Sequence, residues 1–140
     1  MSERPIALVT GAARGIGAAC ARALAAEGFR VAIHHNASAE AAEKLAGELP
    51  EAFALRADLA VPAQVEALLD TLAERVGRVD VLVHGDTHVP EVELMRGVLL
   101  VNPGSPTFPR NLTRRLGTVG FVEIEAGVEG LLGLHLEGPW

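Results

Sequence analysis

The first half of the chain alternates short apolar runs with stretches in which apolar residues recur at helical spacing. Residues 6–10 form an apolar run that ends at glycines, and residues 16–24 repeat apolar positions every three or four residues until Gly28. The first pattern is typical of a buried strand and the second of an amphipathic helix. The N-terminal segment is therefore predicted to fold as a strand, a turn and a helix.

Two more strand-and-helix pairs and a fourth strand are predicted to follow. The expected strands are residues 29–34, 52–57 and 79–83, and the expected helices run from Ser38 to Pro50 and from Pro62 to Gly77. Serine favours the cap of a helix, proline suits its first turn, and glycine commonly ends it. This alternation predicts right-handed crossovers and an α/β fold, in which a parallel sheet of order 3-2-1-4 carries helices on both faces.

The hydrophobic pattern changes after residue 84, where no further helix is expected. Residues 91–95 and 98–102 flank Arg96-Gly97, and residues 118–125 and 128–136 flank Ala126-Gly127. Apolar runs separated by such dipeptides predict antiparallel β-hairpins. The hairpins are expected either to extend the parallel sheet past its fourth strand or to cover it as a second layer.

Composition limits the class of protein. The 140 residues, of which 49% are hydrophobic and 21% charged, predict a single globular domain with one core. A net charge of -6 without a lysine-rich run disfavours a nucleic-acid partner. Cys20 is the only cysteine, which suits a reducing compartment, and no run is apolar enough to span a membrane. We expect a cytoplasmic protein, or one made only by recombinant expression, with no membrane partner; the oligomeric state stays open.

A glycine-rich segment lies between the first expected strand and the first expected helix. It reads Thr10-Gly11-Ala12-Ala13-Arg14-Gly15-Ile16-Gly17. Glycines at these positions allow a tight turn and the close approach of a pyrophosphate to the helix N-terminus, whose unpaired N–H groups favour anions. The segment therefore predicts a dinucleotide-binding site, with a small-molecule dinucleotide as the partner.

The spacing T-G-x-x-x-G-x-G resembles that of the short-chain dehydrogenase/reductase family. Asp58-Leu59, after the third strand, resembles the family's acidic position that contacts the adenine ring, although Asp58 could also be a plain loop carboxylate; residues 78–83 resemble the family's fourth strand. The resemblance implies a Rossmann-like fold for residues 1–83. It also implies cofactor contacts from Gly11, Arg14, Gly15, Ile16, Gly17, Asn36, Ser38, Asp58 and Leu59.

The tip of the second strand indicates which cofactor is preferred. His34-His35-Asn36 contains no Asp or Glu that could hold a ribose 2′-hydroxyl and repel a 2′-phosphate. NADP(H) is therefore expected rather than NAD(H), with Arg14 and Ser38 near the added phosphate. The alternatives are that Arg14 is a solvated loop cation and that Ser38 is only a helix cap.

The catalytic pattern of the resembled family is incomplete in this chain. The resemblance implies a later Ser and a Tyr-x-x-x-Lys segment, but the chain has no tyrosine, and its only lysine is Lys44 in the second expected helix. Without a phenol as general acid, carbonyl reduction lacks its usual proton donor. We therefore assign no catalytic residue. An oxidoreductase that uses another acid, such as His84 or His88, is the alternative.

A second motif follows the fourth strand. His84-Gly85-Asp86-Thr87-His88-Val89-Pro90, with residues 97–105, resembles the C-terminal part of small metallophosphoesterases of the phosphodiesterase type. That resemblance implies that His88 is a metal ligand and that Asp86 replaces a second one. The other ligand motifs are missing, so two-metal hydrolysis is not expected. An extended segment could still bring His84, Asp86 and His88 to one metal ion, although chance spacing is the expected explanation.

Two partial signatures that meet near residue 83 predict a chimera, either engineered or recombined, without native catalysis. Residues 1–83 would form its Rossmann-like half, and residues 84–140 an all-β, phosphoesterase-like half. The expected function is at most NADP(H) binding. An NADPH-dependent oxidoreductase and a metal-dependent phosphodiesterase are the two alternatives.

Overall fold

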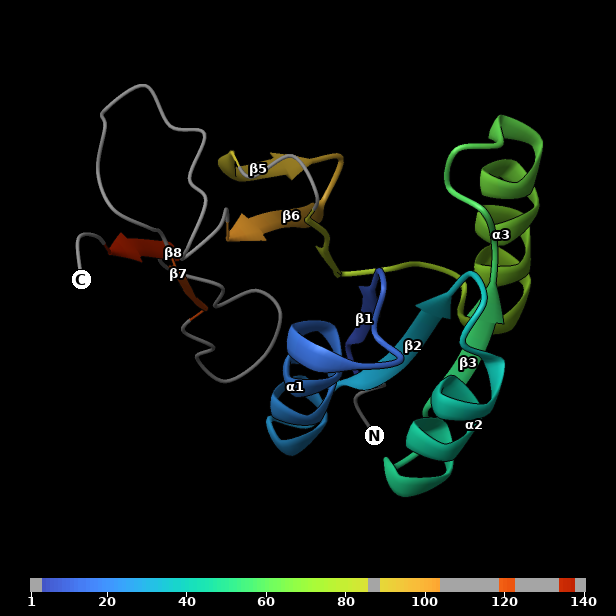
Figure 1. Cartoon of the computed structure of the whole chain (residues 1–140). Helices are drawn as coiled ribbons and strands as arrows, with labels where there is room; N and C mark the ends of the chain where they lie inside the picture. The colour runs from blue at the N-terminus through green and yellow to red at the C-terminus, as the bar shows by residue number, and fades with distance from the viewer. Residues whose placement is uncertain (1–3, 86–88, 104–118, 123–133, 138–140) are drawn as a thin grey trace. The chain divides into compact units, whose positions relative to one another are not determined.

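The computed structural model describes residues 4–85, 89–103, 119–122 and 134–137. Residue contacts divide the chain into two compact units, Met1–Asp80 and Val81–Trp140. The first unit holds β1 (Ile6–Val9), α1 (Gly15–Ala26), β2 (Arg30–His35), α2 (Ala39–Glu48), β3 (Phe53–Arg56) and α3 (Pro62–Val76) (Figure 1). The second holds β4 (Val81–Val83), β5 (Pro90–Met95), β6 (Val98–Pro103), β7 (Val119–Val122) and β8 (Leu134–Glu137).

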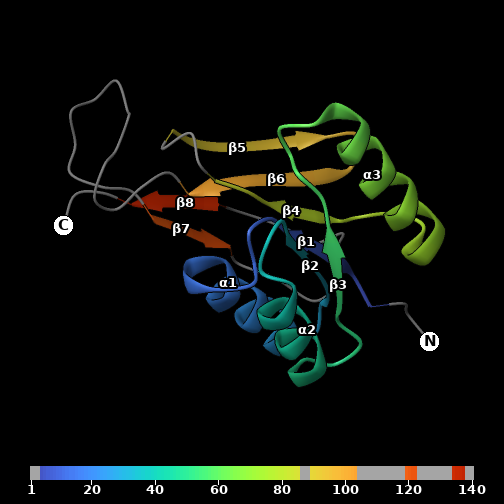
Figure 2. The same ribbon diagram turned by 45° about the vertical axis from the view of Figure 1, so that its right-hand side comes forward.

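The first unit is a parallel sheet covered by helices. β2 is its central strand and pairs in parallel with β1, where Ala7 is opposite Val31, and with β3, where Ile33 is opposite Ala54. Helices α1 and α2 lie on one face of these strands and α3 lies on the other (Figure 2). Because both faces are covered, β1 is buried along its whole length, which explains its continuous apolar sequence.

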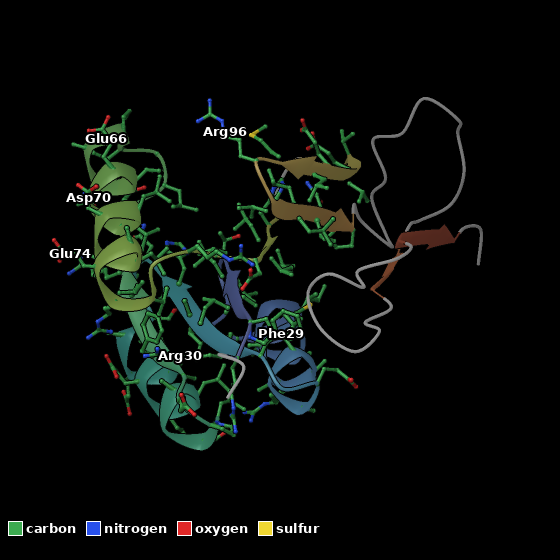
Figure 3. All side chains as sticks on the ribbon, turned by 180° about the vertical axis from the view of Figure 1, so that it is seen from behind. Phe29, Arg30, Glu66, Asp70, Glu74 and Arg96 are labelled. Carbon is green, nitrogen blue, oxygen red and sulfur yellow. The ribbon has the colours of Figure 1, made fainter. Side chains whose placement is uncertain are left out.

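The core of this unit lies between the strands and the inner faces of the helices. Phe29, only 1% exposed, enters the core at the start of β2, where its N–H donates to the carbonyl of Leu24 at 3.0 Å (Figure 3). Burial of a side chain of this size stabilises a fold by about 1.5–3 kcal/mol. On α3, Leu68 and Leu72 are buried, whereas Glu66, Asp70 and Glu74 extend from its outer side (Figure 3). The buried residues of α3 therefore follow the helical spacing predicted from the sequence, except that Leu69, also expected on the buried face, is 53% exposed.

The segment after α3 is tied to β1 by Asp80. The buried Asp80 carboxylate accepts a hydrogen bond from the Ile6 N–H at 2.8 Å through Oδ2, and the Asp80 N–H donates to the Ile6 carbonyl at 2.9 Å. The hydrogen-bonded strand order is β3-β2-β1-β4-β6-β5. The predicted parallel order 3-2-1-4 is thus confirmed.

The first predicted hairpin is confirmed in the second unit. β5 pairs with β6 in antiparallel fashion, and Met95 is opposite Val98 across a two-residue turn. Arg96 and Gly97 both have positive φ, at 51° and 82°, as the tightest hairpin turns require. β6 in turn pairs in parallel with β4, where Leu82 is opposite Leu100, so the hairpin continues the strand pairing beyond β4.

The second predicted hairpin corresponds to a separate two-stranded sheet. β7 and β8 pair in antiparallel fashion, with Val122 opposite Leu134. The predicted turn at Ala126-Gly127 lies outside the described residues. Among the helices that the structure describes, none combines the length and the apolar character that a membrane crossing requires.

Candidate functional site

Three loops of the first unit leave the same edge of its sheet. They follow β1, β2 and β3 and comprise residues 10–14, 36–38 and 57–61. Because these strands are parallel, their carboxyl ends share one edge, which is where open α/β sheets bind ligands. All the cofactor contacts predicted from the sequence lie in these loops or in the first turn of α1.

The loop after β1 depends on its glycines. Gly11 and Gly15 have φ of +60° and +58°, a conformation that only glycine adopts readily, and their positions border open space. Gly17 is restricted for a different reason, since a β-carbon there would stand 2.5 Å from the Gly11 oxygen and 2.9 Å from the α-carbon of Ala12. The first turn of α1 therefore packs directly on the loop, backbone against backbone.

The N-terminus of α1 suits an anion. Arg14 holds the N-cap position without a capping hydrogen bond from its side chain, and no acidic residue lies in the first turn. The positive end of the helix dipole is therefore not offset by a carboxylate of the first turn. Ile16, 69% exposed, adds an apolar side chain beside the loop.

Arg14 and Ser38 lie together, although they are far apart in the sequence. The Arg14 Nη2 donates to the Ser38 Oγ at 2.5 Å. Ser38 is the N-cap residue of α2, yet its side chain makes no capping hydrogen bond to that helix. Arg14 is exposed but has a side-chain partner, and Asn36 is exposed in the same loop as Ser38. A cation and a hydroxyl thus stand side by side at the tip of β2, a pairing suited to a phosphate.

Asp58 shapes the loop after β3. Its Oδ1 accepts from the Ala60 N–H at 3.0 Å, and its own N–H donates to the Gln64 Oε1 at 2.8 Å. These bonds form the turn that leads into α3, so Asp58 has a structural role in the loop. Leu59, next in the chain, is 46% exposed at the same edge.

His34 connects two of the loops, a role that the sequence did not predict. Its buried ring accepts from the Gly11 N–H at Nδ1, at 3.1 Å, and its Nε2 lies 2.9 Å from the Ala57 oxygen. The Ala12 N–H donates to the His34 carbonyl at 3.0 Å. The one available signal was the pair of histidines, His34 and His35, that follows the apolar residues of β2.

The predicted metal ligands are described only in part. His84 follows β4, is half-buried, and donates its N–H to the Val101 carbonyl at 2.9 Å. Asp86 and His88 lie outside the described residues. Within residues 4–85, 89–103, 119–122 and 134–137, the structure shows no group of three or more His, Cys, Asp or Glu residues that could hold a metal ion.

Comparison with known proteins gives a consistent family. The sequence model for short chain dehydrogenases matches residues 5–95. The protein named as ketoacyl reductase 2 of the granaticin polyketide synthase in Streptomyces violaceoruber is 42% identical over 110 residues, which are 71% of this chain and 44% of that protein. The 3-oxoacyl-[acyl-carrier-protein] reductase of a Synechocystis species is 39% identical over 65% of this chain and 38% of its own length. The chain thus spans less than half the length of these relatives.

Solved structures agree with the sequence relatives. A short chain dehydrogenase from Burkholderia cenocepacia in complex with NADP is 43% identical, covers 59% of this chain and 35% of that chain, and has a TM-score of 0.55. The landomycin C-6 ketoreductase LanV, with bound NADP and rabelomycin, is 40% identical over 56% of this chain and 36% of its own, with a TM-score of 0.52. NADP is therefore the cofactor bound in these structural neighbours.

The prediction of a chimera without native catalysis is wrong. The family match passes through the expected junction at residue 83 and ends only at residue 95, the last residue of β5. The change of hydrophobic pattern after residue 84 has a simpler cause, since β5 and β6 pair in antiparallel fashion whereas the preceding strands are parallel. The comparisons lend no support to a metallophosphoesterase half.

The expectation that the chain belongs to no enzyme is also wrong. The relatives are named as reductases and ketoreductases, which are oxidoreductases. That expectation rested on a missing tyrosine in 140 residues, and those residues span less than half of the relatives' length.

Proposed function

Because this chain belongs to the short-chain dehydrogenase family, we propose that it forms the NADP(H)-binding part of a ketoreductase of that family. The contact between Gly17 and the Gly11 carbonyl carries the proposal. That contact brings the loop after β1 onto the first turn of α1, where N–H groups can receive a pyrophosphate. Relatives that are about 40% identical and bind NADP support the choice of ligand.

The residues at the tip of β2 favour the phosphorylated cofactor. The tip has no carboxylate that would bind a ribose 2′-hydroxyl, because the chain reads His34-His35-Asn36 there. The paired side chains of Arg14 and Ser38 offer a cation and a hydroxyl in its place. A charged hydrogen bond to phosphate is roughly twice as strong as a neutral one, so we infer a preference for NADP(H) over NAD(H).

The proposed reaction is carbonyl reduction, the activity that the relatives' names describe. When bound, NADPH supplies a hydride to the carbonyl carbon, and a proton added to the carbonyl oxygen completes the alcohol. The 140 residues contain no tyrosine. Their proposed role is therefore to bind and orient the cofactor. Ile16 and Leu59 add apolar surface around that site.

The test is a calorimetric titration of the chain with NADP+ and with NAD+, repeated on a Gly15→Val/Gly17→Val variant. We expect tighter binding of NADP+ than of NAD+, and loss of both in the variant, because valine strains the positive φ at Gly15 and overlaps the Gly11 oxygen at Gly17. Circular dichroism of the variant separates a lost site from a lost fold. Absence of binding by the parent chain would refute the proposal.

A second assay addresses the reaction. NADPH oxidation is followed at a fixed concentration of the chain with simple ketones and a 3-oxoacyl thioester, the class that the name of the Synechocystis relative describes. Carbonyl-dependent NADPH loss that disappears in the Gly15→Val/Gly17→Val variant would support ketoreductase activity in this chain. Carbonyl-dependent loss that persists in the variant would show that the glycine loop is not its site.

A further inference from the structure

His34 makes side-chain hydrogen bonds in two directions. Its ring is 4% exposed and lies between the loop after β1 and the end of β3. The Gly11 N–H donates to Nδ1 at 3.1 Å, and Nε2 stands 2.9 Å from the Ala57 carbonyl oxygen. Both contacts are long-range, each joining residues separated by 23 positions.

The two partners define the state of the imidazole. A backbone N–H can only donate, so Nδ1 must carry a lone pair; a carbonyl can only accept, so Nε2 must carry the proton. The ring is therefore neutral with its proton on Nε2. A neutral imidazole has one donor and one acceptor nitrogen, and both are used here.

The central residues of the loop that His34 holds have no polar side chains of their own with which to fix its shape. Gly11, Ala12 and Ala13 carry no polar side-chain atoms, and Gly11 adopts φ of +60°. Glycine loses more conformational entropy on ordering than any other residue. When the loop is already ordered before the ligand binds, this entropy loss does not lower the affinity.

We propose that His34 is a positioning residue that sets the shape of the glycine loop for a pyrophosphate. The proposal rests on the proposed function, because it names the group that prepares the same site. The imidazole fixes the Gly11 amide, and the His34 carbonyl fixes the amide of Ala12 through a 3.0 Å bond. The Nε2 contact braces the ring against the end of β3.

Three substitutions at His34 separate these contacts. His34→Ala removes both. His34→Asn places an oxygen near the position of Nδ1 and keeps an acceptor for Gly11, whereas His34→Gln reaches toward Ala57 and loses that acceptor. His35→Ala is the matched control, because His35 is also buried, at 5% exposure, and its side chain points to the opposite face of the strand.

The first readout needs no ligand. Nitrogen NMR spectra of the His34 ring show which ring nitrogen is protonated. Amide hydrogen exchange measures how strongly the Gly11 N–H is protected. We expect the proton on Nε2 in the parent chain and at least tenfold faster Gly11 exchange in His34→Ala and His34→Gln. His34→Asn should restore most of the protection, and His35→Ala should leave it within about twofold. Unchanged Gly11 exchange in His34→Ala would overturn the inference.

The second readout compares NADP+ with adenosine 2′-monophosphate, which has no pyrophosphate. We expect about tenfold weaker NADP+ binding in His34→Ala, near-parental binding in His34→Asn, and adenosine 2′-monophosphate affinity within about twofold of the parent in both. Equal losses for the two ligands in His34→Ala would show a general structural role and overturn the inference. Failure of the parent chain to bind NADP+ would refute the proposed function, whereas the Gly11 exchange rates would still decide whether His34 fixes the loop.

Discussion

Gly17 packs against the backbone of Gly11 so closely that a β-carbon on Gly17 would lie 2.5 Å from the Gly11 carbonyl oxygen. The α-carbon of Ala12 would lie 2.9 Å away on the same side. Both neighbours are backbone atoms, so neither can rotate aside as a flexible side chain would. Any residue larger than glycine must therefore move the loop or the helix.

Gly17→Ala is expected to destabilise the first unit by about 1–3 kcal/mol, the usual cost of an added methyl group in tightly packed surroundings. It should also weaken NADP+ binding, because the displaced loop no longer presents its N–H groups to the pyrophosphate. Urea unfolding and calorimetric titration measure the two effects.

Gly47→Ala is the matched control for this prediction. Gly47 also lies within a helix, α2, but nothing stands within 4 Å of its β-carbon position. Alanine there should stabilise the chain by about 0.5–1 kcal/mol, because it favours the helix more than glycine does. A Gly17→Ala variant as stable as the Gly47→Ala variant would contradict the close contact in the structure.

Much of the first unit follows from local sequence pattern. Strands covered on both faces need unbroken apolar runs, and amphipathic helices need a period near 3.6, so alternation alone indicates the βα order. The predicted helix from Pro62 to Gly77 agrees with α3 at Pro62–Val76, since proline and glycine mark its ends. The hairpin at Arg96-Gly97 was likewise predictable from its turn residues.

The contact between His34 and Gly11 was not predictable, because no local period links residues that lie 23 positions apart. Arg14 and Ser38 were expected near the same phosphate, but the hydrogen bond between their side chains, across 24 positions, was not predicted. The junction near residue 83 was misread because the segments at residues 84–90 and 97–105 resemble another family, whereas the short chain dehydrogenase model continues to residue 95. The change of hydrophobic pattern added to the error. A sheet that changes from parallel to antiparallel pairing changes its hydrophobic pattern without any change of family.

Arg14→Gln should lower the affinity for NADP+ by about tenfold and leave that for NAD+ within about twofold. The reason is that NADP+ alone carries the 2′-phosphate, which the Arg14 guanidinium beside Ser38 would bind. Isothermal titration with each nucleotide measures the selectivity. Arg22→Gln, in the helix that Arg14 caps and with the same loss of charge, is the control and should leave the ratio of the two affinities unchanged. Equal losses for both nucleotides in Arg14→Gln would instead mean that Arg14 binds the shared pyrophosphate.

Asp80→Ala should destabilise the chain by about 1–3 kcal/mol, because it leaves the N–H of the buried Ile6 without its acceptor. Asp80→Asn keeps an oxygen for that N–H and should cost less. The Arg78 guanidinium forms an ion pair with the Asp80 Oδ1, but the Arg78 side chain is 73% exposed, so water screens the pair. Arg78→Gln should therefore change the free energy of unfolding by less than about 1 kcal/mol. Urea unfolding measures the stability of the three variants. A larger loss of stability in Arg78→Gln than in Asp80→Ala would show that the ion pair with Arg78, and not the hydrogen bond to Ile6, is the main contribution of Asp80.

Burial raises the pKa of the Cys20 thiol, which lies half-buried in α1. The thiolate is the reactive form, so folded protein at neutral pH should react with iodoacetamide at least about tenfold more slowly than protein unfolded in urea. The folded pKa lies above the unfolded one. The contribution of this thiol to the free energy of unfolding is therefore fully present below the pKa of the unfolded state. It is lost as the pH rises through the pKa of the folded state. Because Cys20 is the only cysteine, mass spectrometry of the alkylated chain over a series of alkaline pH values follows it directly. Equal rates for folded and unfolded protein would show that the thiol is not protected by burial.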